Sequence, residues 1–170
     1  MKLEFVNPTL KYKNEISQAL LEIINIEEVN DPIPGTSNIN GYSTIEEWLE
    51  FVNKKDIDTV LVPFIQYLVF NENKELVGFL NIRLSLNEHL LNFGGHIGYC
   101  VVPKHRRRGY ATEMMKRAIK VCKENDINEI LMTCKVDNLA SEKIILKNNG
   151  NFDDIRFDGK SSFKRFWIKL

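Results

Sequence analysis

The spacing of apolar residues divides the first third of the chain into two helical segments and a loop. In the segment 14–28 apolar side chains recur every three or four residues, which is typical of an amphipathic helix. The segment 31–42 collects Pro, Gly and Asn and predicts a loop. Ser43 or Thr44, followed by two glutamates, predicts the N-cap of a second helix that ends near Asn53.

The middle of the chain has the texture of β-structure. The runs 64–70 and 76–84 flank the turn 71–74 and predict an antiparallel hairpin. Small and β-branched residues over 96–102 predict a central strand that another group approaches closely, and Pro103 ends its ladder of hydrogen bonds.

In the last third of the chain, segments with the apolar spacing of a helix alternate with segments that have the apolar pattern of a strand. The segment 109–124 has one apolar and one basic face and predicts a helix packed on a sheet. A buried strand at 129–134, a helix at 138–149 and two closing strands at 151–157 and 163–168 follow. The order α, α, β, β, β, α, β, α, β, β fits one α/β or α+β domain with a mixed sheet.

Composition and charge exclude several classes of protein. The chain has 170 residues, enough for one core, and Lys plus Arg equals Asp plus Glu at 23 each, so no global field favours nucleic acid or an anionic membrane. Residues 1–12 do not resemble a signal peptide, and no apolar run is long enough to span a bilayer. The cysteines, Cys100, Cys122 and Cys134, are widely spaced, which predicts no disulfide, no metal site and a cytoplasmic location.

A local anion site is predicted where the central strand meets the next helix. The basic run 104–108 follows Pro103, and Gly109 opens the helix. The first turn of a helix offers unpaired N–H groups and the positive end of its dipole, and glycine lets the backbone approach a phosphate. Arginine forks add charge around a diphosphate. Walker and Rossmann fingerprints are absent, and the alternative interpretation is a solvated basic turn.

The motif Arg-x-x-Gly-x-Ala at 106–111 resembles the (Gln/Arg)-x-x-Gly-x-(Gly/Ala) signature of the GNAT superfamily of N-acetyltransferases. About thirty residues further on, 137–141 and the helix after it resemble the family's second CoA motif. The resemblance runs from about Phe64 to the C-terminus, and the segments 94–99 and 164–168 are similar to one bacterial branch of acetyltransferases.

This resemblance implies a mostly antiparallel sheet flanked by helices, with two splayed central strands that form a cleft for acetyl-CoA. It implies transfer of an acetyl group from acetyl-CoA to a primary amine of a small molecule or protein, by a monomer or homodimer without metal. The acceptor would meet the helices at about 13–54, and the CoA-binding core would span about 64–170. The residues that the motif positions assign to CoA binding are Tyr99, Cys100, Val101, Arg106, Arg107, Arg108, Gly109, Tyr110, Ala111, Thr112, Asn138 and Ser141.

Catalytic residues are less clearly marked. The N–H of Val101 is the expected donor to the oxyanion, and His96 is the first candidate for the base because imidazole titrates near neutral pH. Glu88 and His89 are alternates. The tyrosine that many members use as an acid corresponds to Ile145, seven residues after Asn138, so the usual acid is missing.

Three further residues have two interpretations each. Arg83 would bind an acceptor carboxylate or form a surface ion pair. Cys134 invites an acyl-enzyme, but a small core residue is the preferred interpretation. Trp48, with Phe51 and the loop 31–42, would form the acceptor wall, or would lie in the core. The missing tyrosine also leaves open a non-catalytic CoA-binding sensor.

Overall fold

The helices and strands follow the order that the apolar pattern predicts. The computed structural model describes residues 1–27, 29, 31–54 and 62–170, so the predicted end of the first helix at residue 28 lies outside the described residues. The principal elements are α1 (Lys13–Glu27), α2 (Ile45–Asn53), β2 (Phe64–Phe70), β3 (Leu76–Arg83), β4 (Ile97–Val101), α3 (Tyr110–Glu124), β5 (Glu129–Lys135), α4 (Leu139–Lys147), β6 (Asn151–Phe157) and β7 (Ser162–Lys169).

One strand escaped the sequence analysis. β1 (Glu4–Val6) pairs antiparallel with β2, with Phe5 opposite Val69. A strand of 3 residues is too short for alternation to stand out from chance. Its pairing was decided by the neighbouring strand and not by its own sequence.

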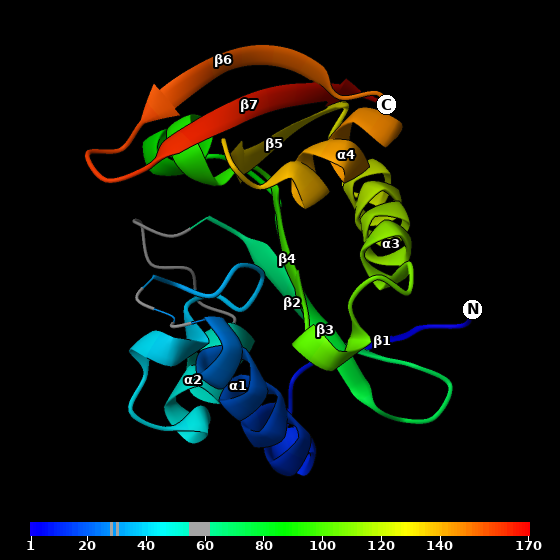
Figure 1. Cartoon of the computed structure of the whole chain (residues 1–170). Helices are drawn as coiled ribbons and strands as arrows, with labels where there is room; N and C mark the ends of the chain where they lie inside the picture. The colour runs from blue at the N-terminus through cyan, green and yellow to red at the C-terminus, as the bar shows by residue number, and fades with distance from the viewer. Residues whose placement is uncertain (28, 30, 55–61) are drawn as a thin grey trace.

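The strands form two antiparallel sheets, one ordered β1-β2-β3-β4 and the other β5-β7-β6. In Figure 1, α1 and α2 lie on one side of the first sheet, and α3 and α4 lie on the other, next to the second sheet. The prediction of a mostly antiparallel architecture flanked by helices is therefore confirmed. The sheet expected to be mixed is instead two sheets, in which every strand pair among the described residues is antiparallel. The two sheets meet near one end of β4 and β5, where the N–H of His96 donates to the carbonyl of Leu131.

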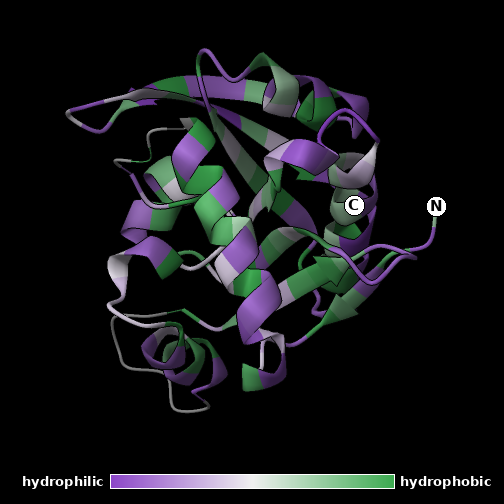
Figure 2. Cartoon of the chain, turned by 60° about the horizontal axis from the view of Figure 1, so that its bottom comes forward, coloured by the Kyte–Doolittle hydropathy of each residue, from purple (hydrophilic) through white to green (hydrophobic). Residues whose placement is uncertain are grey.

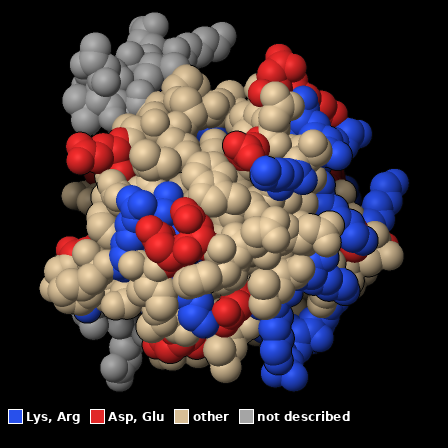
Figure 3. Space-filling model, turned by 90° about the horizontal axis from the view of Figure 1, so that it is seen from above, with Lys and Arg blue, Asp and Glu red and all other residues tan. Residues whose placement is uncertain are grey.

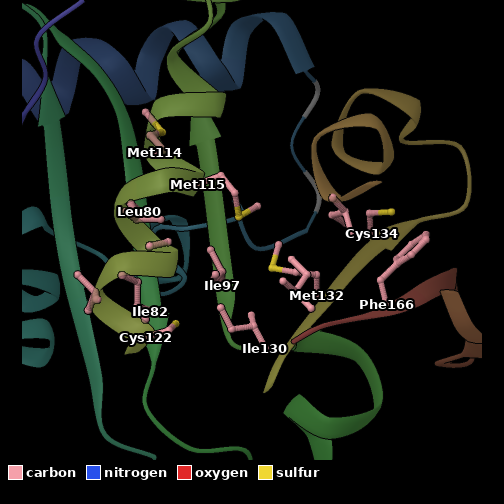
Figure 4. Close-up of a cluster of buried hydrophobic side chains, with 14 of the residues drawn as sticks. Leu80, Ile82, Ile97, Met114, Met115, Cys122, Ile130, Met132, Cys134 and Phe166 are labelled. Atoms are coloured by element: carbon pink, nitrogen blue, oxygen red, sulfur yellow. The ribbon is translucent and has the colours of Figure 1, made fainter. Parts of the chain in front are cut away.

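Two apolar clusters hold these layers together. One lies between α3, α4 and both sheets, and Figure 4 shows Ile97 of β4 beside Ile130 and Met132 of β5, with Met114 and Met115 of α3 above the first sheet. These side chains fill the end where the sheets meet, because burying each of them is worth about 2 kcal/mol.

The second cluster packs α1 and α2 on β2 and β3 around Trp48, which is fully buried. The predicted N-cap of α2 is confirmed: the hydroxyl of Thr44 accepts from the N–H of Glu47, and the Glu47 carboxylate accepts from the N–H of Ser43. Figure 2 shows hydrophilic and hydrophobic residues alternating around the helices, as amphipathic packing requires.

All three cysteines are free thiols. Among the described helices, none has the length and apolarity that a membrane crossing needs.

Candidate functional site

The site begins where β4 and β5 separate. The N–H of His96 donates to the carbonyl of Leu131 at 2.8 Å, and the N–H of Leu131 donates to Nδ1 of the same histidine at 2.9 Å. Beyond this point the two strands belong to different sheets. Figure 1 shows them diverging from there, so each presents one open edge to the other.

Hydrogen bonds on the closed side of β4 determine which groups face the open edge. The N–H of Val102 donates to the carbonyl of Val77, so even-numbered residues of β4 point their backbone groups at β3. Backbone direction alternates along a strand. The N–H and C=O groups of Tyr99 and Val101 therefore face the open edge, and those of Cys100 do not. The sequence-based assignment of Cys100 beside them is corrected on this ground.

The opposite edge was missed by the sequence analysis. The N–H of Val136 donates to the carbonyl of Ser162 in β7, so the backbone of Thr133 and Lys135 faces away from β7, toward β4. The hydroxyl of Thr133 also donates to the carbonyl of Phe93 at 2.7 Å, which links β5 to the segment before β4. These residues are identified by the alternation of backbone direction along β5, which can be assigned only when the register of β5 with β7 is known.

The predicted anion loop has the backbone shape of an anion nest. Arg107 has a φ of 63° and Gly109 a φ of 86°, both left-handed. The carbonyl of Gly109 accepts from the N–H groups of Thr112 and Glu113, which begins α3. Within the described part of the chain, the N–H groups of Gly109, Tyr110 and Ala111 donate to no acceptor. Three consecutive free N–H groups at the positive end of a helix fit a diphosphate oxygen.

The arginines divide their tasks. Arg107 and Arg108 are exposed beside the nest, where they can reach a polyanion. Arg106 instead turns back, and its Nε donates to the carbonyl of Val101 at 3.0 Å. Its guanidinium therefore ties the anion loop to the open edge of β4.

The second motif reaches the open edge from the other side. The amide oxygen of Asn138 accepts from the N–H of Ser141 and caps α4. Asn138 therefore lies at the start of this helix, where the sequence analysis expects it. The hydroxyl of Ser141 lies 3.0 Å from that of Tyr99, so a side chain of β4 bridges to α4. Burial raises the pKa of Tyr99, which keeps its hydroxyl protonated. One turn further along α4, Ile145 is fully buried in the core.

The geometry of His96 favours a structural role over that of the predicted base. The ring is 6% exposed, and Nδ1 is occupied by the N–H of Leu131. Burial lowers the pKa of His96 to about 4. A base this weak is poorly suited to take a proton from the substrate ammonium at neutral pH. Glu88 and His89, its alternates, are exposed at the start of a helical segment that continues through Leu90–Gly94 before β4, where a loop was predicted.

This burial predicts a pH dependence of stability. The unfolded chain, with a histidine pKa near 6.5, takes up the proton before the folded chain, whose pKa is about 4. The stabilisation is therefore complete above about pH 6.5 and is lost as the pH falls toward 4, in total roughly 2 kcal/mol after allowance for screening. Denaturant unfolding of wild type and His96→Asn between these pH values measures it. We expect a flatter profile in the variant, and parallel profiles would contradict the assignment.

The remaining candidates are placed as follows. Burial raises the pKa of Cys134 to about 11, so this core thiol is not the thiolate that an acyl-enzyme needs. Trp48 is fully buried and donates to the carbonyl of Thr36 at 2.7 Å, so it supports the loop 31–42 from beneath and cannot itself be a surface wall. Phe51 is half-buried and stacks on Phe64.

Sequence reasoning also missed a polar cluster on the face of the first sheet that the loop 31–42 covers. The side chain of Gln66 accepts from Ser37 and Asn81 and donates to the carbonyl of Gly35 at 2.8 Å. Polar residues inside the otherwise apolar strands β2 and β3 were the available signal. The described residues contain no group of three or more His, Cys, Asp or Glu side chains that could hold a metal ion.

Comparison with known proteins agrees with this geometry. The profile described as the acetyltransferase (GNAT) family matches residues 25–150, and no curated protein matches the sequence. The fold and site define an acyltransferase. More specifically, the chain belongs to the GNAT family of acetyltransferases.

Three solved structures illustrate the shared fold. The ribosomal L7/L12 alpha-N-protein acetyltransferase RimL, in complex with coenzyme A, is 16% identical with a TM-score of 0.73, over 100% of this chain and 95% of that chain. A GNAT acetyltransferase from Streptococcus pneumoniae is 17% identical, with a TM-score of 0.67 over 99% and 100%. The spermidine N-acetyltransferase SpeG from Vibrio cholerae is 15% identical, with a TM-score of 0.67 over 99% and 95%.

Proposed function

We propose that residues 1–170 form one unit that transfers an acetyl group directly from acetyl-CoA to a primary amine. The observation that carries this proposal is the continuity between the anion nest of Gly109 and the open edge of β4. Coenzyme A joins a diphosphate to an extended arm with two amides, and the site offers free N–H groups for the first and an unpaired strand edge for the second.

The site residues then have separate tasks. Residues 107–112 bind the diphosphate, and the backbone of Tyr99 pairs with the amides of the arm, which leaves the N–H of Val101 for the thioester carbonyl. Asn138 fixes the start of α4 beside that arm. Exposed lysines of α3 and α4 lie on the side that carries most of the basic surface in Figure 3, where they would attract the anionic cosubstrate.

The reaction needs no covalent enzyme intermediate. A neutral amine attacks the thioester carbon, and negative charge develops on the carbonyl oxygen. The C–S bond then breaks, the nitrogen gives up a proton to become an amide, and the released thiolate takes up a proton to become the free thiol of coenzyme A. The N–H of Val101, directed at the open edge, is the proposed donor to that oxygen. We propose that water at the open edge takes the proton from the substrate ammonium, because Nδ1 of His96 already accepts a hydrogen bond and the ring is weakly basic.

Tyr99 replaces the missing tyrosine of α4 in this proposal. Its hydroxyl lies on β4 and is bridged to Ser141 of α4 across the open edge, whereas Ile145 is buried on α4. In this proposal the Tyr99 hydroxyl donates a hydrogen bond to the leaving sulfur.

Replacing Tyr99 with Phe is expected to lower kcat about ten-fold or more while leaving the affinity for coenzyme A nearly unchanged. Single-turnover transfer and calorimetric binding of coenzyme A measure the two effects. Ser141→Ala removes the partner of the hydroxyl and keeps the hydroxyl itself, so its loss of kcat is expected to be smaller. Equal losses in the two variants would assign the hydrogen bond a purely structural role.

The function itself is tested by thiol release from acetyl-CoA over a panel of amines, with mass spectrometry of the acetylated product. We expect turnover with at least one class of primary amine. Tight binding of coenzyme A without turnover on any acceptor would instead support a CoA-binding sensor.

A further inference from the structure

Arg83, the last residue of β3, is a partly buried cation without a carboxylate partner among the described residues. Its Nη1 donates to the carbonyls of Gly94 at 3.1 Å and Gly95 at 3.4 Å. Its Nε and Nη2 donate to no acceptor in the described ranges. The ion pair that the sequence analysis offered as an alternative is therefore not found among these residues.

Two other arginines with limited exposure have charged or aromatic neighbours among the described residues, although Nε of Arg117 has no hydrogen-bond partner there. Arg165, whose side chain is 4% exposed, pairs with Asp153 at 2.7 Å and Asp154 at 2.8 Å. Arg117 lies over the rings of Phe5 and Tyr67, whose faces attract a cation. Among the described residues no carboxylate pairs with Arg83, whose recorded hydrogen bonds go to the carbonyls of two glycines.

The guanidinium lies on the acceptor face of β4. A Cβ added to Gly98 would stand 3.2 Å from Nη2 of Arg83 and 3.1 Å from the backbone nitrogen of Gly35 in the loop 31–42. Glycine at position 98 therefore lets Nη2 of Arg83 and the backbone of Gly35 pack directly against β4, where a side chain would be crowded. The guanidinium lies on the same face of the sheet as the polar cluster of Gln66 and Asn81.

The phosphates of coenzyme A are not the missing anion. The anion nest follows the end of β4 near Val101, whereas Arg83 is opposite His96, at the other end of the strand. Five residues of strand separate these ends by roughly 16 Å. Desolvation lowers the pKa of Arg83 to about 10, so the guanidinium is still charged at neutral pH and can bind an anion there.

We propose that Arg83 binds a carboxylate of the acceptor, so that the substrate is a small molecule with both a primary amine and a carboxylate. This inference rests on the proposed function, because the acceptor must lie on this side of β4. A carboxylate held near Gly98 places an amine a few bonds away within reach of a thioester near Val101. The same cation repels a polyamine, so spermidine, the substrate named for the structural neighbour SpeG, is not expected to serve.

The test compares matched acceptors: several amino acids, their carboxamides and spermidine, with acetyl-CoA at saturation. For wild type we expect kcat/KM to be 10- to 100-fold higher for the free carboxylate than for its amide. Arg83→Gln should reduce that ratio to near one without changing the affinity for coenzyme A. Arg83→Lys retains the charge without the fork and should retain part of the preference.

Two outcomes would overturn the inference while leaving the proposed function intact. One is equal or better turnover of amides and spermidine by wild type, and the other is an unchanged carboxylate preference in Arg83→Gln. If wild type transfers to no acceptor, the proposed function fails. Calorimetry of amino acids with the coenzyme A complex then decides the inference separately: binding to wild type, lost in Arg83→Gln at equal melting temperature, supports it, and no binding to wild type overturns it.

Discussion

Replacing Gly109 with Asp is expected to weaken the binding of coenzyme A at least 100-fold. The φ of Gly109 is 86°, and a Cβ there meets only the end of the Met1 side chain, at 3.7 Å. The new carboxylate would therefore fit without disturbing the core. It would stand beside the free N–H groups of α3, satisfy them and repel a diphosphate, and 100-fold in affinity corresponds to about 2.7 kcal/mol.

The matched control is Gly109→Asn, which has the same shape and the same tolerance of a left-handed backbone but no charge. We expect a loss below about ten-fold, close to the strain of roughly 1 kcal/mol that a side chain adds at this φ. Calorimetric titration with coenzyme A measures both variants, and circular dichroism confirms that both fold. Equal affinities for coenzyme A in the Asp and Asn variants would contradict the proposal that this loop binds the diphosphate.

Replacing Val101 with Pro is expected to lower kcat by about 10²- to 10³-fold. The N–H of Val101 faces the open edge and not β3, so proline removes the proposed oxyanion donor without removing a hydrogen bond of the sheet. Losing one such donor costs about 3 to 4 kcal/mol of transition-state stabilisation.

Two measurements separate this effect from damage to the strand. Val101→Ala keeps the N–H and loses only part of a half-buried side chain, so its kcat should fall no more than a few-fold. The melting temperature of Val101→Pro should stay within several degrees of wild type. A kcat for the proline variant within ten-fold of the alanine variant would contradict the role of this N–H.

Membership of the GNAT family does not determine which amine accepts the acetyl group. RimL acts on a ribosomal protein and SpeG on spermidine, yet both share this fold at about the same low identity. The choice of acceptor must therefore lie in side chains of the acceptor face rather than in the fold. Among the described residues of that face, Arg83 and the polar cluster around Gln66 are the candidates that we propose for this choice.

The sequence by itself determined most of the elements and the position of the anion loop. Helices such as α3 and strands such as β2 carry their period in the order of their own residues, and the glycine and arginines of 106–111 are a local motif on a local turn. The cap of α2 at Thr44 is local in the same way. Each of these depends on neighbours within a few positions, which the sequence contains in full.

Only the tertiary structure decided which groups of these elements face one another. His96 fitted a catalytic base by residue type, but its Nδ1 is bound by Leu131, 35 residues further along the chain. Register alone turns Val101 toward the open edge and Cys100 away from it, and Arg83, at the end of β3, has no carboxylate partner among the described residues. Burial, register and the partners of a charge are relations between distant segments, so no pattern of nearby residues encodes them.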